Sequence, residues 1–296
     1  IRNLLEGIRE GEKVVSILPL DRELIQNPEG HYIIFATSQG RIKRSHLSDY
    51  VKINRNGKYA LKFAKDNDSL VQVRPATKED HVVLVSSMGY ACRFLPSEAK
   101  TRVDAATGES TTTHTVRVQG RVSQGVAGMK LQSGDRVVGM IVTDDFDTSV
   151  LTISKHGMAK RSRLGSGSMI EIKLEDGTIA QGDDGEPLME RDGYRKTNRG
   201  TKGVRTMALS DGDFIIGVRQ IPDLSDQLFM LTDKGMMIRM PATQTKETLG
   251  KVTKGTRIME LRTKDKKSYA DEIVFVARLP SDLVERGDLE SEGEEE

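Results

Sequence analysis

Arginine and lysine residues recur at fixed places along this chain, and their pattern is its clearest chemical signal. Four similar segments each carry an arginine four residues after a glycine, at Arg44, Arg93, Arg161 and Arg239. One such arginine alone would favour a surface charge that pairs with a neighbouring acid, whereas the fourfold recurrence favours a shared role. Cations spaced along a curved surface contact the phosphates of duplex nucleic acid without reading its bases.

A second group of cations lies beside glycines. The stretch 199–205 combines Arg199, Lys202 and Arg205 with two glycines, and glycine lets backbone N–H groups approach a phosphate closely. An ordinary turn between repeats is the alternative interpretation. Because few aromatic residues interleave the cations, we expect contact with duplex backbone rather than stacking of single strands. The candidate residues for contact with a nucleic-acid duplex are Arg41, Lys43, Arg44, Lys58, Arg93, Arg121, Lys160, Arg161, Arg163, Arg199, Lys202, Arg205, Arg239, Lys254 and Arg257.

Other chemistries find little support in the sequence. The five histidines and Cys92 share no metal-ligand spacing, and the acids of 183–186 lack the calcium-loop pattern. No G-x-x-x-x-G-K-[ST] phosphate loop occurs, and the titratable residues are dispersed, which disfavours an enzyme with its own site. We therefore expect no catalytic residue, metal or cofactor in this chain. The single cysteine fits a reducing cytoplasm, and no stretch reaches the roughly 18 apolar residues of a membrane helix, so we expect no membrane partner.

The net charge of +1 conceals a division along the chain. Residues 281–296 carry eight acids and one arginine, and without them the remaining residues 1–280 have a net charge of +8. A basic body with an acidic tail suggests a surface for polyanions with which the tail competes. A disordered tail that only aids solubility is the equal alternative.

The elements that position these cations form a repeat of three phrases. The first phrase is an apolar strand, a turn that closes on glycine and a second short strand, which predicts a β-hairpin. The second phrase is glycine, three residues, then two apolar residues one position apart, and the third is an acid before an apolar strand. The first phrase covers 33–44, 83–93, 150–161 and 228–239, the second 57–63, 125–131, 203–209 and 255–261, and the third 68–73, 134–139, 212–217 and 271–276.

The spacing of the phrases predicts the architecture. Successive hairpin glycines are 49, 68 and 78 residues apart, which indicates a unit of about 50 residues with insertions at 101–120 and 165–196. The second insertion contains an extra hairpin around 170–177. Four short strands per unit predict propeller-like blades that stack on their neighbours. The expected blades are 21–76, 77–143, 144–221 and 222–280, after the second half of a blade at 1–20 and before the acidic tail at 281–296.

This order of phrases resembles the C-terminal DNA-wrapping domain of bacterial DNA gyrase A, from residue 1 to about residue 280. The resemblance implies an all-β β-pinwheel, in which hairpins are exchanged between blades and DNA bends around the outer rim. Because the chain begins in the middle of a repeat, we expect a partial ring, truncated at its N-terminal side. The family's box Gln-Arg-Arg-Gly-Gly-Lys-Gly is not intact here, and residues 197–203 match it at Arg199, Gly200, Lys202 and Gly203.

The resemblance also implies partners. In the whole enzyme this domain would wrap double-stranded DNA, next to gyrase B and a second copy of gyrase A. ATP and Mg²⁺ would serve that holoenzyme, which introduces negative supercoils by ATP-dependent strand passage in the cytoplasm, associated with the nucleoid. No tyrosine here resembles the strand-cleaving tyrosine of type IIA topoisomerases. The alternatives are the C-terminal domain of the topoisomerase IV counterpart of gyrase A, disfavoured by the repeat count and the acidic tail, and a protein-interaction propeller, which would carry apolar or acidic residues where arginine recurs.

Overall fold

The computed structural model describes residues 14–52, 57–103, 107–174, 176–248, 253–263, 265 and 268–283. The chain forms two compact units. The first unit consists of Ile1–Ser86, Cys92–Asp144 and Thr197–Gly203, and the second of Ser87–Ala91, Asp145–Lys196 and Val204–Glu296. Most of the predicted half-blade at 1–20 and of the acidic tail at 281–296 lies outside the described residues.

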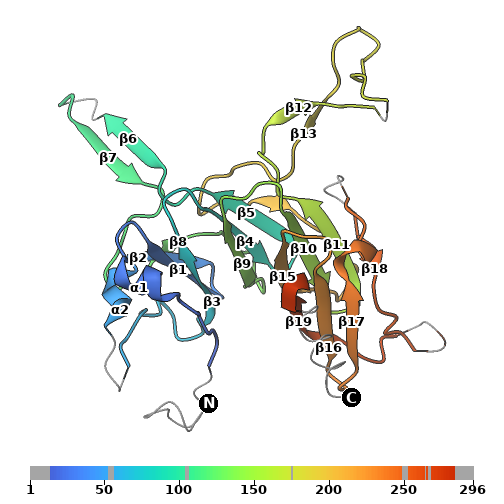
Figure 1. Cartoon of the computed structure of the whole chain (residues 1–296), viewed down its shortest axis with the longest axis horizontal. Helices are drawn as coiled ribbons and strands as arrows, with labels where there is room; N and C mark the ends of the chain where they lie inside the picture. The colour runs from blue at the N-terminus through green and yellow to red at the C-terminus, as the bar shows by residue number, and fades with distance from the viewer. Residues whose placement is uncertain are drawn as a thin grey trace, which may run out of the picture. The chain divides into compact units, whose positions relative to one another are not determined.

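Short antiparallel strands dominate the fold, which confirms the predicted all-β class (Figure 1). The helical elements are α1 (Arg22–Gln26), α2 (Ser48–Val51) and the 3₁₀ helix η1 (Ala242–Gln244). The strands are β1 (Tyr32–Thr37), β2 (Arg41–His46), β3 (Leu70–Ala76), β4 (His81–Ser86), β5 (Tyr90–Phe94), β6 (Ala99–Val103), β7 (Ser110–His114), β8 (Val126–Ala127), β9 (Val137–Thr143), β10 (Ser149–Ser154), β11 (Met158–Arg163), β12 (Met169–Glu171), β13 (Met189–Arg191), β14 (Val204–Arg205), β15 (Ile215–Ile221), β16 (Gln227–Thr232), β17 (Met237–Pro241), β18 (Thr256–Arg257) and β19 (Ile273–Leu279).

Each first phrase of the repeat folds as a hairpin: β1/β2, β4/β5, β10/β11 and β16/β17. The turn glycines have φ between +77° and +84°, a left-handed conformation that side chains with a Cβ rarely adopt. They are Gly40, Gly89, Gly157 and Gly235.

The sheets combine strands from two successive repeats. Their orders are β3-β1-β2-β8, β14-β5-β4-β9 and β15-β10-β11-β18, with a three-stranded sheet β17-β16-β19 from the last repeat. In the first three sheets a two-residue strand of the following repeat's second phrase pairs with the second hairpin strand, as in Arg41↔Ala127 and Met158↔Arg257. The exchange between repeats therefore involves these short strands, where the resemblance implied whole hairpins.

The exchanged strands explain why the hairpin turns need glycine. A Cβ built on Gly40, Gly89 or Gly157 would lie 2.6, 2.4 or 2.4 Å from a methionine carbonyl oxygen of the next repeat. At Gly235, in the sheet where no fourth strand is formed by described residues, nothing lies within 4 Å of such a Cβ. Three of the four glycines are thus fixed both by their φ and by the backbone that crosses over them.

The acid that opens the third phrase fastens a hairpin turn to its sheet, as the first and third repeats show. The Asp68 carboxylate accepts hydrogen bonds from Thr37 Oγ1 at 2.8 Å, Ser38 Oγ at 3.1 Å and the Gln39 amide at 2.9 Å. Asp213 accepts from the His156 amide at 3.2 Å in the third repeat. A buried carboxylate that accepts several hydrogen bonds is satisfied without a cation, so the recurring acid has a structural role.

The apolar strands pack differently in the two units. In the first unit, Ile33, Phe35 and Leu47 form a cluster with leucines of the segment around α1. In the second unit every residue of β10 is buried, and Leu151 and Ile153 join Leu228 and Met230 in one core. Strands covered on both faces read as continuous apolar runs, as the sequence indicates here. No helix in the described part of the chain is long and apolar enough to cross a membrane.

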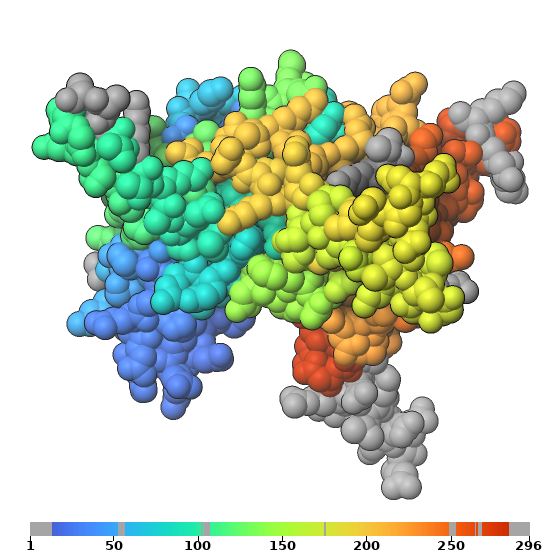
Figure 2. Space-filling view, turned by 90° about the horizontal axis from the view of Figure 1, so that it is seen from above, coloured from blue at the N-terminus to red at the C-terminus, as the bar shows by residue number. Residues whose placement is uncertain are grey.

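The two insertions form hairpins that project from their own units (Figure 1). The first, β6/β7, was not predicted, because its threonine-rich strands are exposed and lack apolar alternation. In the second, the predicted turn is present, since Lys173 bridges to Ile179 across it, but most of the first strand pairs with β13 instead. In the space-filling view, the yellow atoms of this insertion lie at the surface of the second unit (Figure 2).

Candidate nucleic-acid interface

Three of the four recurrent hairpin arginines are buried. Arg44, Arg93 and Arg161 lie inside their blades, whereas Arg239 is exposed. The Arg161 guanidinium donates to Thr245 O at 2.9 Å and forms an ion pair of 3.0 Å with Glu247. The Arg44 guanidinium stacks on Tyr32 at 3.8 Å, and Arg93 Nε donates to His81 Nδ1 at 3.3 Å. These three side chains make their contacts within the protein.

Two lysines one position earlier are also buried. Lys43 Nζ donates to Ala60 O at 2.6 Å and to Arg121 O at 2.5 Å, and Lys160 Nζ donates to Thr206 O at 2.7 Å. Burial lowers the pKa of both ammonium groups from 10.5 to about 8. Cys92 holds the same place in the second hairpin, with its Sγ 3.1 Å from Thr197 Oγ1. Side chains at this place therefore tie the hairpin to loops of its own repeat or of the following one.

The cations beside the second-phrase glycines have the opposite arrangement. Lys202 and Lys254 are exposed and directly precede Gly203 and Gly255, whose φ angles are +80° and +76°. Two residues after these glycines, on β14 and β18, stand exposed arginines. Arg205 contacts Tyr90 OH at 2.8 Å and Arg257 pairs with Glu260 at 2.8 Å. Repeats three and four thus present equivalent pairs of cations to solvent.

A glycine is required where these loops meet the preceding hairpin. A Cβ on Gly125 would lie 2.4 Å from Ile42 O, and one on Gly255 would lie 2.2 Å from Ala159 O. The backbones of loop and hairpin are therefore in direct contact. Because the inner side of the loop is filled by backbone, the neighbouring Lys254 side chain stays on the solvent side.

The other predicted cations brace these loops or lie near them. Arg41 donates to Gln124 O at 2.8 Å and Gly125 O at 2.7 Å, and Arg199 donates to Thr115 O and to Ala127 O. Arg121 is half-buried, and Lys58 is exposed and donates to Lys52 O. Arg163 is exposed and pairs with Asp147 at 3.1 Å and Asp192 at 3.5 Å.

The structure adds one cation that sequence reasoning did not select. Lys100, on β6, donates to Asn198 Oδ1 at 3.1 Å and so connects the first inserted hairpin to the stretch 197–203 that matches the family box. No repeat or spacing marks Lys100 in the sequence. Only the pairing of distant segments in the first unit reveals it.

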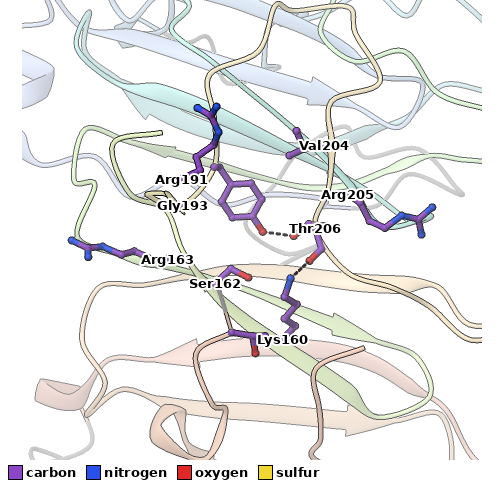
Figure 3. Close-up of a pocket in the computed structure, with 10 residues that line it drawn as sticks. Lys160, Ser162, Arg163, Arg191, Gly193, Val204, Arg205 and Thr206 are labelled. Carbon is purple, nitrogen blue, oxygen red and sulfur yellow. Dashed lines mark hydrogen bonds between the residues drawn. The ribbon is translucent and has the colours of Figure 1, made fainter. Parts of the chain in front are cut away.

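A small cavity in the second unit lies beneath one of these loops (Figure 3). Lys160 and the Tyr194 hydroxyl meet there at Thr206, while Arg163 and Arg205 point away from each other. Its free volume of about 30 Å³ suits water and is far too small for a nucleotide. Among the described residues, no three His, Cys, Asp or Glu side chains gather in a way that could hold a metal.

Comparisons with known proteins agree on one family. A family model described as the DNA gyrase C-terminal domain, β-propeller, matches residues 31–77, 110–144, 148–166, 189–222 and 226–279. The chain is 28% identical over 253 residues to the DNA gyrase A protein of Staphylococcus epidermidis, covering 85% of this chain and 23% of the relative. It is 29% identical over 283 residues to the DNA gyrase A protein of Rickettsia prowazekii, covering 88% and 29%. The chain thus spans about a quarter of the length of these relatives.

Two solved structures share the fold. A crystal structure of the C-terminal domain of DNA topoisomerase IV superposes with a TM-score of 0.68 at 18% identity, covering 98% of this chain and 74% of that chain. A DNA gyrase A C-terminal domain superposes with a TM-score of 0.59 at 20% identity, covering 85% and 67%.

Proposed function

Because the chain belongs to the family of DNA gyrase C-terminal domains, we propose that it binds duplex DNA and bends it along the cationic loops at its sheet edges. The observation that carries this proposal is the recurrence of exposed cations around the second-phrase glycines. Lys202 and Arg205 flank Gly203 in the same way that Lys254 and Arg257 flank Gly255. Equivalent cations on successive blades suit the repeating phosphates of a duplex.

The phosphate contacts fall to the exposed members of the candidate set. A phosphate reaches a guanidinium or ammonium group only at the surface, and removing Arg161 from its partners Thr245 and Glu247 would leave polar groups unpaired. The buried cations act indirectly: Lys43 and Lys160 hold the loops through backbone carbonyl groups. The exposed or half-buried set comprises Arg41, Lys58, Arg121, Arg163, Arg199, Lys202, Arg205, Arg239, Lys254 and Arg257.

The binding is insensitive to base sequence. The cations lie on loops, on two-residue strands and on hairpin strands, and neither a projecting helix nor a row of aromatic rings accompanies them in the described ranges. Reading bases requires side chains that enter a groove, and stacking of single strands requires aromatic platforms. Phosphate contact alone gives affinity that depends on salt and not on sequence.

In the whole protein we assign this domain to gyrase A of a DNA gyrase, a cytoplasmic, nucleoid-associated enzyme. The complex with gyrase B and a second copy of gyrase A would pass one segment of the wrapped DNA through another. ATP and Mg²⁺ would bind to other domains of that complex. The second candidate is the topoisomerase IV counterpart of gyrase A. The TM-score of 0.68 to a topoisomerase IV C-terminal domain is the observation that supports this second candidate.

A binding experiment with charge-matched variants tests the proposal. The first variant replaces Lys202, Arg205, Lys254 and Arg257 by Ala, and the control replaces Lys62, Lys65, Lys78 and Lys173, four exposed lysines outside the candidate set. We expect the first variant to lose most of its affinity for a labelled duplex in fluorescence anisotropy, and the control to keep most of it. Equal losses in the two variants would mean that net charge, not the loops, determines binding.

A topology assay tests bending separately. A relaxed plasmid is incubated with the chain and a type I topoisomerase, and the linking number is then read on a gel. Constrained writhe that disappears in the loop variant and persists in the control supports bending along the loops. Tight binding without any change in linking number would limit the function to binding.

A further inference from the structure

The second insertion has a composition opposite to that of the body that carries it. Residues 168–192 contain eight acids and two bases, a net charge of −6, in a chain whose residues 1–280 total +8. The segment also exposes large apolar side chains, with Leu174 51%, Leu188 44% and Ile170 38% exposed. We call residues 168–192 the acidic arm. Phosphates repel such a segment, so it does not belong to the DNA surface.

The base of the acidic arm is firmly fixed. Leu164 and Tyr194, on either side of it, are buried, and the Tyr194 amide donates to Leu164 O at 2.8 Å. The Gly165 amide donates to Phe146 O at 2.9 Å. A Cβ on Gly193 would meet Leu164 O at 2.1 Å, so the two strands of the base lie in direct contact. The arm is therefore presented in a defined orientation within the second unit.

Three segments of the arm pair around one point and give it an apolar face. The Ile172 amide donates to Leu188 O, the Ala180 amide to Ile172 O and the Leu188 amide to Ala180 O, each at 2.8 Å. Residues paired across antiparallel strands point their side chains to the same face of the sheet, and so does every second residue along each strand. Ile170 and Leu174 therefore lie on the face of Ile172, Ala180 and Leu188, which we call the arm face.

Acids surround the arm face. Glu190 pairs with Ile170 across β12 and β13 and so shares the arm face at its margin. Asp176, Asp183, Asp184 and Glu186 occupy the exposed turns. A contiguous apolar patch rimmed by charge is typical of a protein-interaction surface.

The last sheet of the same unit has a complementary uncovered face. Burial alternates along β16, with Leu228 and Met230 in the core and Phe229 and Leu231 on the other side. Leu231 pairs with Met237 on one neighbour and with Phe275 on the other, and these two side chains are 61% and 48% exposed. We call this side the outer face of the last sheet.

The outer face carries a positive charge within its apolar surface. Arg239 is exposed and pairs with Phe229 in the register of β16 and β17, so it lies in the row next to Leu231 and its neighbours. By contrast β10, in the preceding sheet, is buried at every position. Sheets of a repeat array bury both faces against neighbouring repeats. In the last sheet, by contrast, the outer face exposes apolar side chains and Arg239 to solvent.

We propose that the arm face of one copy docks on the outer face of the last sheet of a second copy. Both faces are apolar sheet surfaces, and acids at the margin of the first meet Arg239 on the second. Residues of both faces are exposed among the described residues of the second unit, and the occupant that we assign to each face is the opposite face of a second copy. In a two-fold pair each copy supplies one arm and one outer face, which closes the assembly with two identical contacts. Because Arg239 also belongs to the set proposed to contact DNA, the association is measured without DNA.

Sedimentation velocity with charge reversals tests the proposal on the full 296-residue chain. We expect a dimer at about 100 µM protein and 50 mM salt, weakened at about 500 mM, where screening is stronger. Glu190→Arg and Arg239→Glu should each lower the association constant about tenfold or more, because each places like charges opposite one another. The chain with both changes should recover the association of the parent chain.

Apolar variants provide an independent measurement. Leu174→Ser with Leu188→Ser should abolish the dimer, while Val103→Ser, at a more exposed apolar site of the β6/β7 hairpin, should leave it intact. Circular dichroism melting checks that each variant is folded. A parent chain that stays monomeric under these conditions, or a double charge variant that does not recover, overturns the proposal. So does an arm variant that dimerises normally but loses DNA affinity.

Discussion

The hairpin glycines offer a matched comparison of two alanine substitutions in one unit. Gly157 and Gly235 occupy equivalent turns with φ of +83° and +84°. A Cβ at Gly157 would lie 2.4 Å from Met259 O, whereas a Cβ at Gly235 would have nothing within 4 Å. Both substitutions carry the same backbone strain, and only Gly157→Ala adds a collision with the segment that follows the exchanged strand β18 of the next repeat.

The magnitudes follow from these two terms. A left-handed residue with a Cβ costs about 1–2 kcal/mol, which applies to both sites. Forcing extra volume into packed structure costs about 1–3 kcal/mol more, which applies to Gly157→Ala alone, since backbone atoms cannot move aside as a flexible side chain does. We therefore expect Gly235→Ala to lower the free energy of unfolding by about 1–2 kcal/mol and Gly157→Ala by about 2–5 kcal/mol.

Urea unfolding followed by circular dichroism measures both values, with the m value checked for constancy. Gly212→Ala is a further control, because its φ is +71° and a Cβ there also meets open space. We expect it to resemble Gly235→Ala. If all three variants were destabilised equally, the close contact between hairpin turn and exchanged strand would be refuted.

Two further predictions concern the buried cations. Arg161→Ala should lower stability by about 1–3 kcal/mol, because it leaves Thr245 O without its donor and removes the partner of the exposed Glu247; it should leave the salt dependence of DNA binding unchanged, and urea unfolding with anisotropy checks both. The pKa of Lys160 is about 8 in the folded chain against 10.5 when unfolded, so above pH 8 the unfolded chain binds more protons and stability should rise with pH. Between pH 8 and about 9.5 we expect a rise on the order of 1 kcal/mol from this lysine and a similar rise from Lys43. Lys160→Met should remove only the share of Lys160, and a total rise equal to that of the parent chain would contradict the assignment.

Local sequence rules predicted the hairpins and their turns. Glycine at a turn and apolar residues before it are sufficient to indicate strand, turn and strand, and Gly40, Gly89, Gly157 and Gly235 all have the positive φ that was expected. The recurrent acid was recognised as part of a phrase, but its hydrogen bonds to the turn were not. Those bonds join residues about 30 positions apart, such as Thr37 and Asp68, and spacing along the chain does not reveal them.

The environment of the cations could not be predicted from the sequence. Lys43 and Lys160 stand in strands whose sequences are polar, and they are buried because loops distant along the chain supply carbonyl groups such as Ala60 O and Thr206 O. Arg44, Arg93 and Arg161 recur at one place in the repeat, which suggested a shared role in binding. The same recurrence is expected if each arginine makes the same contact within the protein. Exposure separates the two roles, and exposure depends on which strand of the next repeat covers the hairpin.

The inserted hairpins mark another limit. The β6/β7 strands are exposed along their described residues, so no burial pattern distinguishes them from a polar loop. Their register is nevertheless regular, from Ala99↔His114 to Val103↔Ser110. A hairpin without an apolar face gives no periodic signal in the sequence.

The central claim is that the exposed cations beside the glycines contact DNA phosphates, and the salt dependence of binding tests it most directly. Anisotropy titrations of one duplex at several salt concentrations give the slope of log K against log[salt] for the parent chain, Arg205→Ala, Lys254→Ala and the buried-site variant Arg161→Ala. Each phosphate contact contributes about one unit to the slope. We predict that the slope becomes shallower by about one in Arg205→Ala and in Lys254→Ala and stays at the parent value in Arg161→Ala. Parent slopes in both loop variants, with a shallower slope in Arg161→Ala, would contradict the claim.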